Sequence, residues 1–240
     1  MFKGLSFLLL LSVLNFGCAA QKDSRILVFS KTAGFQHSSI PEGLRAIQEL
    51  ERQGEFLVDT TSDAAGFSAE NLARYRAVVF LNTTGDVLNP AQQTAMEGFI
   101  RSGGGYVGVH AAADTEYDWP WYGRLVGGYF ESHPQVQEAA IDVVDRSHPA
   151  TAHLPARWVR TDEWYNYKNL NPDVKVLALL DESSYEGGKN GDHHPIIWCH
   201  EFDGGRAFYT GGGHTEESYR EPDFMRLLEA GIKWAAGLID

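Results

Sequence analysis

The octapeptide Gly-Gly-Gly-Tyr-Val-Gly-Val-His, residues 103–110, decides the fold that we expect for this chain. Its three glycines are typical of a helix end. The apolar run Tyr106–Val109 then has the length and composition of a strand buried on both faces of a parallel sheet. His110 follows this run directly. Because ligands of open α/β sheets bind beyond the carboxyl ends of the strands, His110 is a candidate functional residue.

Similar apolar runs recur along the chain and alternate with amphipathic segments. We expect further strands at Arg25–Ser30, Glu55–Thr60, Ala77–Leu81, Ala139–Val144, Val174–Leu180, Pro195–Cys199 and Arg206–Thr210. We expect helices from Ser39 to Gly54, from Asn89 to Gly103 and from Pro222 to Ala236. Ser39 would cap the first helix, with Glu42 reaching back to it. This alternation predicts an α/β fold, a three-layer sandwich with a mostly parallel central sheet.

Composition narrows the class of protein and its partners. Of the 240 residues, 43% are hydrophobic and 22% charged, which is typical of a soluble globular protein. A formal net charge of −12 argues against nucleic acid as a partner and favours neutral or cationic small molecules. The two cysteines, Cys18 and Cys199, provide neither a disulfide framework nor a cysteine-based zinc site.

Residues 1–20 have the pattern of a bacterial export signal. Lys3 supplies the positive charge, and Leu5–Leu14 is an apolar run that is too short for a permanent membrane span. Cleavage before Cys18 would give a lipoprotein, anchored to the membrane only through that cysteine. Cleavage after Ala20 would give a soluble exported protein. We therefore expect a periplasmic protein or an outer-membrane or cell-surface lipoprotein, with its domain at 24–240.

Six segments in a fixed order resemble the ThuA-like family, which is named for a trehalose utilisation protein. They are residues 29–37, 103–110, 127–130 with His133-Pro134, Asp145 with His148-Pro149, 162–165 and 208–214. The resemblance implies a class I glutamine amidotransferase-like, flavodoxin-like fold for a single domain, with a middle insertion around 115–170. It also implies carbohydrate catabolism, with sugar oxidoreductases as pathway partners.

The amidotransferase comparison identifies two strand ends. In those enzymes a tight elbow after a strand holds a nucleophilic cysteine, and a later strand delivers a histidine. Here His110 stands in the place of the cysteine, and His214, followed by Glu216 and Glu217, resembles the histidine end. Cys199 lies inside a predicted strand. We therefore do not expect a cysteine-dependent glutaminase.

The candidate catalytic residues are His110, His214 and Glu163. Both histidines end buried strands, and Glu163 stands beside two aromatic residues in the middle insertion. The candidate substrate-binding residues are His37, Asp114, His133 and Tyr165.

Other roles remain open for several of these residues. Glu163 would otherwise be salt-bridged in a packed lobe, and Asp114 would otherwise cap the next helix. The aromatic residues Tyr117, Trp119, Trp121 and Tyr122 are either a carbohydrate platform or a packing cluster.

A divalent metal is a further possibility, with His110, His133 and His214 as ligands and Glu163 beside them. No His-Glu-x-x-His motif supports it, so the ligands would have to converge from separate loops. A nucleotide cofactor is not expected, because no phosphate-binding loop or Gly-x-Gly-x-x-Gly follows a strand.

Three functions follow from these residues. The first is an enzyme that hydrolyses, isomerises or cleaves a sugar or an oxidised keto sugar by histidine acid–base chemistry. The second is a carbohydrate-binding lipoprotein without catalysis. The third is a metal-dependent hydrolase on the same scaffold.

Overall fold

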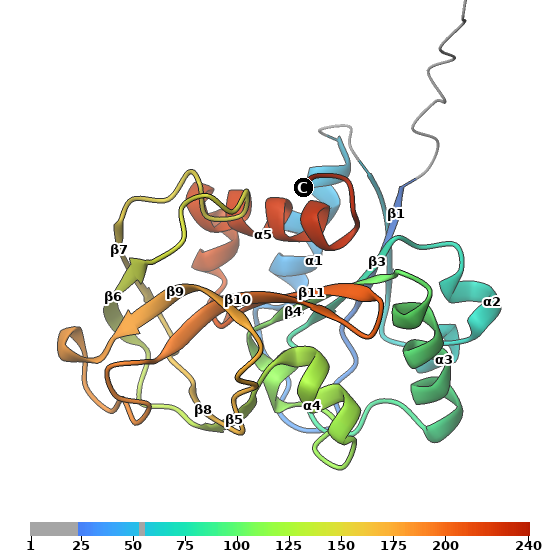
Figure 1. Ribbon diagram of the computed structural model, residues 1–240, viewed down its shortest axis with the longest axis horizontal. Helices are drawn as coiled ribbons and strands as arrows, with labels where there is room; N and C mark the ends of the chain where they lie inside the picture. The colour runs from blue at the N-terminus through green and yellow to red at the C-terminus, as the bar shows by residue number, and fades with distance from the viewer. Residues whose placement is uncertain (1–23, 53–55) are drawn as a thin grey trace, which may run out of the picture.

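Nine strands form one sheet in the computed structural model, which describes residues 24–52 and 56–240 (Figure 1). They are β1 (Arg25–Phe29), β2 (Leu57–Thr61), β3 (Ala77–Leu81), β4 (Gly105–Val109), β6 (Gln137–Val143), β7 (Arg157–Asp162), β9 (Lys175–Asp181), β10 (Pro195–Phe202) and β11 (Gly205–Thr210). The predicted export signal, with Cys18, and the predicted helix end at Gly54 lie outside the described residues.

The strand order is β2-β1-β3-β4-β11-β10-β9-β6-β7. Neighbouring strands from β2 to β11 pair in parallel, and those from β11 to β7 pair antiparallel. As a result only β10 and β6 run against the other strands of this sheet. A separate antiparallel pair joins β5 (Tyr129–Ser132) to β8 (Asn166–Lys168).

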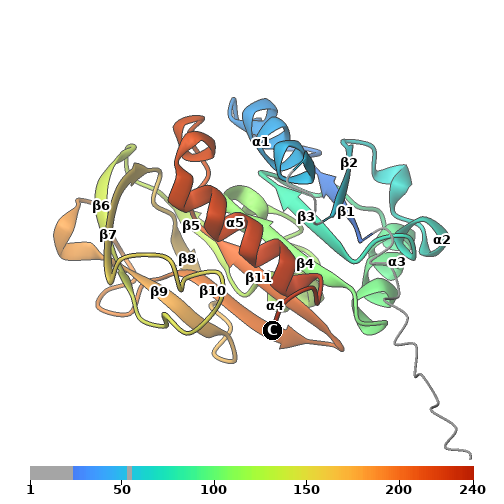
Figure 2. The ribbon, with the colours of Figure 1, turned by 90° about the horizontal axis from the view of Figure 1, so that it is seen from above.

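Helices cover both faces of the sheet, as the three-layer prediction requires. On one face lie α1 (Ile40–Arg52) and α5 (Pro222–Ala235), and on the other α3 (Pro90–Arg101) and α4 (Pro120–Val126) (Figures 1 and 2). The short helix α2 (Ala69–Leu72) lies beside α3. Short 3-10 turns are η1 (Ala64–Gly66), η2 (His110–Asp114), η3 (Glu182–Ser184) and η4 (Glu217–Arg220).

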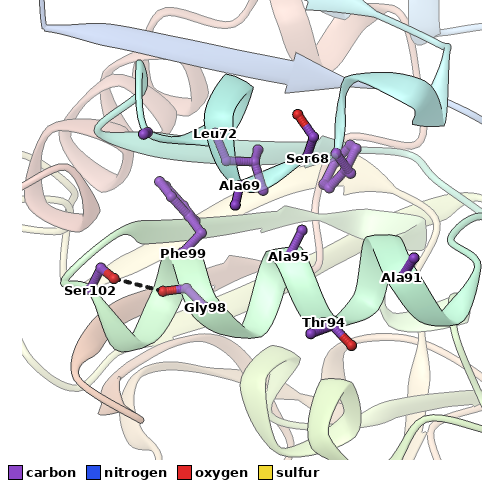
Figure 3. Close-up of a pocket in the computed structure, with 11 residues that line it drawn as sticks. Ser68, Ala69, Leu72, Ala91, Thr94, Ala95, Gly98, Phe99 and Ser102 are labelled. Carbon is purple, nitrogen blue, oxygen red and sulfur yellow. Dashed lines mark hydrogen bonds between the residues drawn. The ribbon is translucent and has the colours of Figure 1, made fainter.

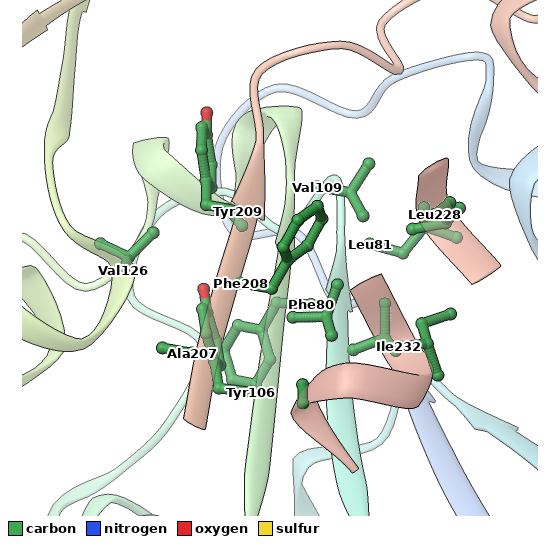
Figure 4. Close-up of a cluster of buried hydrophobic side chains, with 14 of the residues drawn as sticks. Phe80, Leu81, Tyr106, Val109, Val126, Ala207, Phe208, Tyr209, Leu228 and Ile232 are labelled. Atoms are coloured by element: carbon green, nitrogen blue, oxygen red, sulfur yellow. The ribbon is translucent and has the colours of Figure 1, made fainter. Parts of the chain in front are cut away.

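The core lies on both sides of the central strands. Side chains of β11 alternate, so that Phe208 points toward Leu228 and Ile232 of α5 while Tyr209 points to the opposite face (Figure 4). Every residue of β3 and β4 is buried. Burial on both faces explains why these strands appear in the sequence as continuous apolar runs.

The predicted strands and helices are all present, and the boundaries that fall on described residues differ from the prediction by at most three residues. The sequence did not predict β5, β7, β8, α2 or α4, which are short or polar. For example, β7 alternates exposed and buried residues and begins with the exposed Arg157. Ser39 precedes α1 as predicted, and its carbonyl accepts a hydrogen bond from the Gly43 N–H. The predicted side-chain bonds are wrong, because the Ser39 hydroxyl contacts the Gly213 carbonyl and Asn82, while Glu42 pairs with Arg45 and Arg220.

The start of α3 agrees with its sequence pattern. Asn89 and Gln92 form a reciprocal capping box at the start of this helix, where Pro90 is the first helical residue.

In the part of the chain that the structure covers, no helix has the length and apolar character needed to cross a membrane.

One histidine of the fold is buried far from the candidate site. His148 is 6% exposed, and its Nδ1 accepts a hydrogen bond of 3.2 Å from the Ala150 N–H. Its ring lies 5.0 Å from that of Trp234. Burial, with a smaller effect from the Lys175 charge, lowers the pKa of His148 from 6.5 to about 4. Its neutral form therefore stabilises the fold fully above pH 6.5, and this contribution is lost as the pH falls toward 4.

We expect His148→Asn to reduce the loss of unfolding free energy between pH 6.5 and about 4 by on the order of 2 kcal/mol. The amide keeps an acceptor for the Ala150 N–H but gains no proton. Urea denaturation across this pH range measures the effect. His193→Asn, at an exposed position, should leave the pH dependence unchanged. The same pH dependence in wild type and His148→Asn would contradict the assignment.

Candidate functional site

A pocket of about 260 Å³ lies at the carboxyl ends of β4 and β11, where the sequence placed it. Its lining residues are Phe35, His37, Asp114, Phe130, His133, Glu163, Tyr165 and His214. They come from the loop after β1, from η2, from β5 and the turn after it, from the connection between β7 and β8, and from the loop after β11. His110 is fully buried and contacts two of the lining residues, Glu163 and His214.

His110 occupies a constrained elbow. It is the first residue after β4 and has a φ of 46°, a left-handed conformation that is costly for a residue with a side chain. Its Nδ1 lies 2.8 Å from the carbonyl oxygen of Gly211 and must donate to it. The other ring nitrogen, Nε2, faces Glu163 and His214.

Glu163 is the carboxylate at the centre of this group. Its Oε2 lies 3.4 Å from His110 Nε2 and 3.1 Å from His214 Nδ1, and its Oε1 lies 3.0 Å from His133 Nδ1. Burial acts to raise the pKa of Glu163, but the contacts with His110 and His214 outweigh it and hold the pKa well below its usual range. Conversely, Glu163 raises the pKa of His214 against the effect of burial. Glu163 is therefore ionised, and His214 holds its proton more strongly than a free histidine does.

His37 completes the group from the loop after β1. It is 4% exposed, and its ring lies 5.2 Å from that of His110 and 5.1 Å from that of His214. Its Nδ1 is buried and has no hydrogen-bond partner among the described residues. Burial first, and then the neighbouring histidines, lower its pKa to about 3, so the ring is neutral.

One potential ligand atom from each of His37, His110, Glu163 and His214 lies within 4.8 Å of the others. This set differs from the one that the sequence predicted, because His37 takes the place of His133. The His133 side chain is 42% exposed and approaches Glu163 through the other carboxylate oxygen.

Asp114 and Tyr165 lie in the wall of the pocket. Asp114 accepts a hydrogen bond of 2.6 Å from the Tyr117 hydroxyl, and burial raises its pKa. It does not cap α4, whose first turn follows Trp119. The Tyr165 ring lies 4.1 Å from that of His110 and 4.3 Å from that of Phe130.

Two aromatic residues of the pocket, Phe35 and Phe130, were not predicted. Phe35 is 66% exposed, unusual for a large apolar side chain, and stands two residues before His37. Of the two alternatives for the aromatic residues after Asp114, the packing cluster holds for Trp119, Trp121 and Tyr122, which are buried and pack together.

The buried carboxylate of Asp162 positions the main chain that carries Glu163 and His214. It accepts hydrogen bonds from the main-chain N–H groups of Glu163 (2.9 Å), Gly213 (2.8 Å) and His214 (3.1 Å). Arg160 pairs with it at 2.7 Å, and both side chains are almost completely buried. No role for this ion pair was predicted from the sequence.

The Asp162 contacts show that the sheet curves strongly. In the strand order β7 is four spacings from β11, which is about 19 Å in a flat sheet. Asp162, at the end of β7, nevertheless bonds to the loop that follows β11. Curvature of the antiparallel half therefore brings Glu163 to the carboxyl end of the parallel half.

The thiol of Cys199 is not part of the site. It lies buried in β10, and burial raises its pKa to about 12.

A larger pocket of about 600 Å³ lies between α2 and α3 (Figure 3). Its lining is mainly apolar and includes Leu72, Ala95 and Phe99, with no ionisable side chain. The smaller, polar pocket is therefore the better candidate for chemistry.

Comparison with known proteins identifies the family. The model of the ThuA family, described as trehalose utilisation, matches residues 25–235. The chain belongs to the ThuA family. The description of this family connects the chain with carbohydrate metabolism. No protein with a curated description shows significant similarity to the sequence.

Solved structures share the ThuA fold. A ThuA-like protein from Bacteroides uniformis is 24% identical, with a TM-score of 0.75, and the match covers 93% of this chain and 95% of that one. Another from Parabacteroides merdae is 22% identical, with a TM-score of 0.74 and coverage of 90% of each chain. A protein from Thermoplasma acidophilum that is described as part of a GMP synthase is 12% identical, with a TM-score of 0.52 and coverage of 89% and 95%. These likenesses confirm the predicted amidotransferase-like fold.

We expect Asp162→Asn to lower the free energy of unfolding by about 3 kcal/mol, because it leaves the buried Arg160 charge without its closest partner. Urea denaturation measures the change. Asp142→Asn is the matched control, because its pair with Arg157 is about half exposed and should contribute less than about 1 kcal/mol. Equal losses in the two variants would contradict the role assigned to Asp162.

Proposed function

We propose that this ThuA-family protein is an enzyme of carbohydrate catabolism that acts on a sugar or an oxidised keto sugar in the pocket above His110. The observation that carries the proposal is the convergence of the ionised Glu163 with His110 and His214 at one pocket. The family description supports a carbohydrate as the substrate class. A volume of about 260 Å³ suits a small ligand, since pockets for drug-sized molecules begin at about 300 Å³.

In this proposal Glu163 and His214 are the residues that transfer protons to and from the substrate. Glu163 is ionised and can accept a proton from a substrate carbon or hydroxyl, while His214, 3.1 Å away and with a raised pKa, can donate one. A carbon next to a keto group is the favourable place for this transfer, because the carbonyl stabilises the resulting charge. His110 lies beneath this carboxylate, with its Nε2 3.4 Å from Glu163 Oε2.

The remaining residues of the pocket orient the ligand. The Asp114 carboxyl and the Tyr117 hydroxyl form a hydrogen-bonded pair at its edge, suited to sugar hydroxyl groups. Phe35, Phe130 and Tyr165 supply apolar faces. Mostly apolar walls with a few polar groups are usual for small-molecule sites.

We expect Glu163→Gln to lower turnover by about 100-fold or more while ligand binding persists, because the amide cannot accept the proton. Disaccharides and their keto derivatives are screened in heavy water, and mass spectrometry follows both product and deuterium at the carbon next to the keto group. Glu138→Gln changes an exposed glutamate outside the pocket and should retain full activity. If the wild-type protein binds a sugar but shows neither turnover nor deuterium exchange, the proposal of an enzyme is overturned and a sugar-binding protein is favoured.

We further propose that the chain is exported and anchored through a lipid on Cys18. The support is in the sequence alone, in the order of Lys3, the apolar run Leu5–Leu14 and a cysteine preceded by Gly17.

We expect labelled palmitate to be incorporated into the wild-type chain in a bacterial host and to be absent from Cys18→Ser. Cys199→Ser alters the other cysteine and should remain labelled. Mass spectrometry of the mature protein should show an N-terminus at Cys18. An unlabelled protein that begins at Gln21 would indicate a soluble exported form, and retention of residues 1–20 would contradict export.

A further inference from the structure

The donor atoms at the base of the pocket have the spacing of a metal coordination sphere. Four ligands at 2.0–2.1 Å from a tetrahedral ion lie about 3.3 Å from one another. The three measured separations are 3.1 Å from His214 Nδ1 to Glu163 Oε2, 3.3 Å from His214 Nδ1 to His110 Nε2, and 3.4 Å from His110 Nε2 to Glu163 Oε2. His37 contributes a fourth ligand atom within 4.8 Å of the others.

Hydrogen bonds alone do not satisfy this group well. His110 gives its Nδ1 proton to Gly211, so Nε2 is the ring atom directed at Glu163 and His214. His110 Nε2, His214 Nδ1 and Glu163 Oε2 lie within 3.4 Å of one another. Each ring nitrogen carries at most one hydrogen, so hydrogen bonds cannot satisfy all three of these contacts at once. His37 Nδ1 is buried without a hydrogen-bond partner in the described part of the chain.

We propose that His37, His110, His214 and Glu163 bind one divalent transition-metal ion at the base of the pocket. Three imidazoles and one carboxylate suit zinc, iron, nickel or copper, whereas magnesium and calcium prefer oxygen ligands.

The groups behind these side chains support the same assignment. Metal-bound histidines usually donate their second ring N–H to a carbonyl or carboxylate, and Gly211 accepts that proton from His110 at 2.8 Å. Asp162 fixes the main chain of both Glu163 and His214. The ligand set is therefore held in place by contacts that do not involve the ion.

The ion would also face the pocket, since His37, Glu163 and His214 line it. By taking a carbonyl or hydroxyl oxygen of the substrate as a fifth ligand, the ion would polarise it as a Lewis acid. This inference rests on the proposed function and deepens it. With the ion bound, Glu163 Oε2 and His214 Nδ1 would be ligands, and Glu163 Oε1, beside His133, would remain as the proton acceptor. Metal binding is measured without turnover, so each proposal can fail without the other.

Cobalt titration of the purified, chelator-treated chain tests the site. We expect one equivalent of Co²⁺ to bind, with visible absorption typical of nitrogen and oxygen ligands, and Zn²⁺ to displace it. His37→Ala, His110→Ala and Glu163→Gln should each weaken binding by more than about 100-fold. Circular dichroism verifies that the variants are folded, and Glu163→Gln preserves side-chain volume if an alanine variant does not fold.

Two control variants define the ligand set. His193→Ala removes an exposed histidine and should leave the affinity unchanged. His133→Ala removes a histidine that approaches Glu163 through Oε1 and not through the ligand atom Oε2. This variant should still bind one equivalent of Co²⁺, and its affinity should fall far less than that of His37→Ala. The proposal is overturned if the folded wild-type chain binds no stoichiometric Co²⁺ or Zn²⁺, or if His133→Ala abolishes binding while His37→Ala does not.

Discussion

A single buried carboxylate, Asp162, joins the two halves of the sheet at the edge where the pocket lies. Arg160 balances its charge, and the N–H groups of Glu163, Gly213 and His214 donate to it. One of these donors follows β7 and the other two follow β11, so the same carboxylate fixes the relative positions of the pocket's acid and its imidazole. A buried ion pair of this kind is costly to assemble, and its value here is geometric.

The elbow after β4 illustrates how a scaffold can keep its geometry while its chemistry changes. His110 retains a left-handed backbone at a cost of about 1–3 kcal/mol. In the amidotransferases that the sequence resembles, this position holds a thiol nucleophile. Here the Gly211 carbonyl binds Nδ1 of an imidazole instead, which directs Nε2 toward Glu163. The left-handed backbone at this position thus sets the direction of the side chain, whether its functional atom is sulfur or nitrogen.

Local patterns predicted the strands and the two histidines that end them. The runs at β3 and β4 are continuous because both faces are buried, and His110 follows such a run directly. The contributions of β7 were not predictable in this way, because they depend on the curvature of the sheet. The choice between His37 and His133 likewise depends on how far each loop reaches, and no periodicity encodes that distance.

The position of β11 also has a consequence for synthesis. It pairs with β4, yet it is made about a hundred residues later. At ordinary translation rates the hydrophobic edge of β4 therefore waits roughly 5–20 s for its partner. An unpaired edge of this kind invites pairing with other chains. The pocket can therefore form only after β11 and His214 have been synthesised.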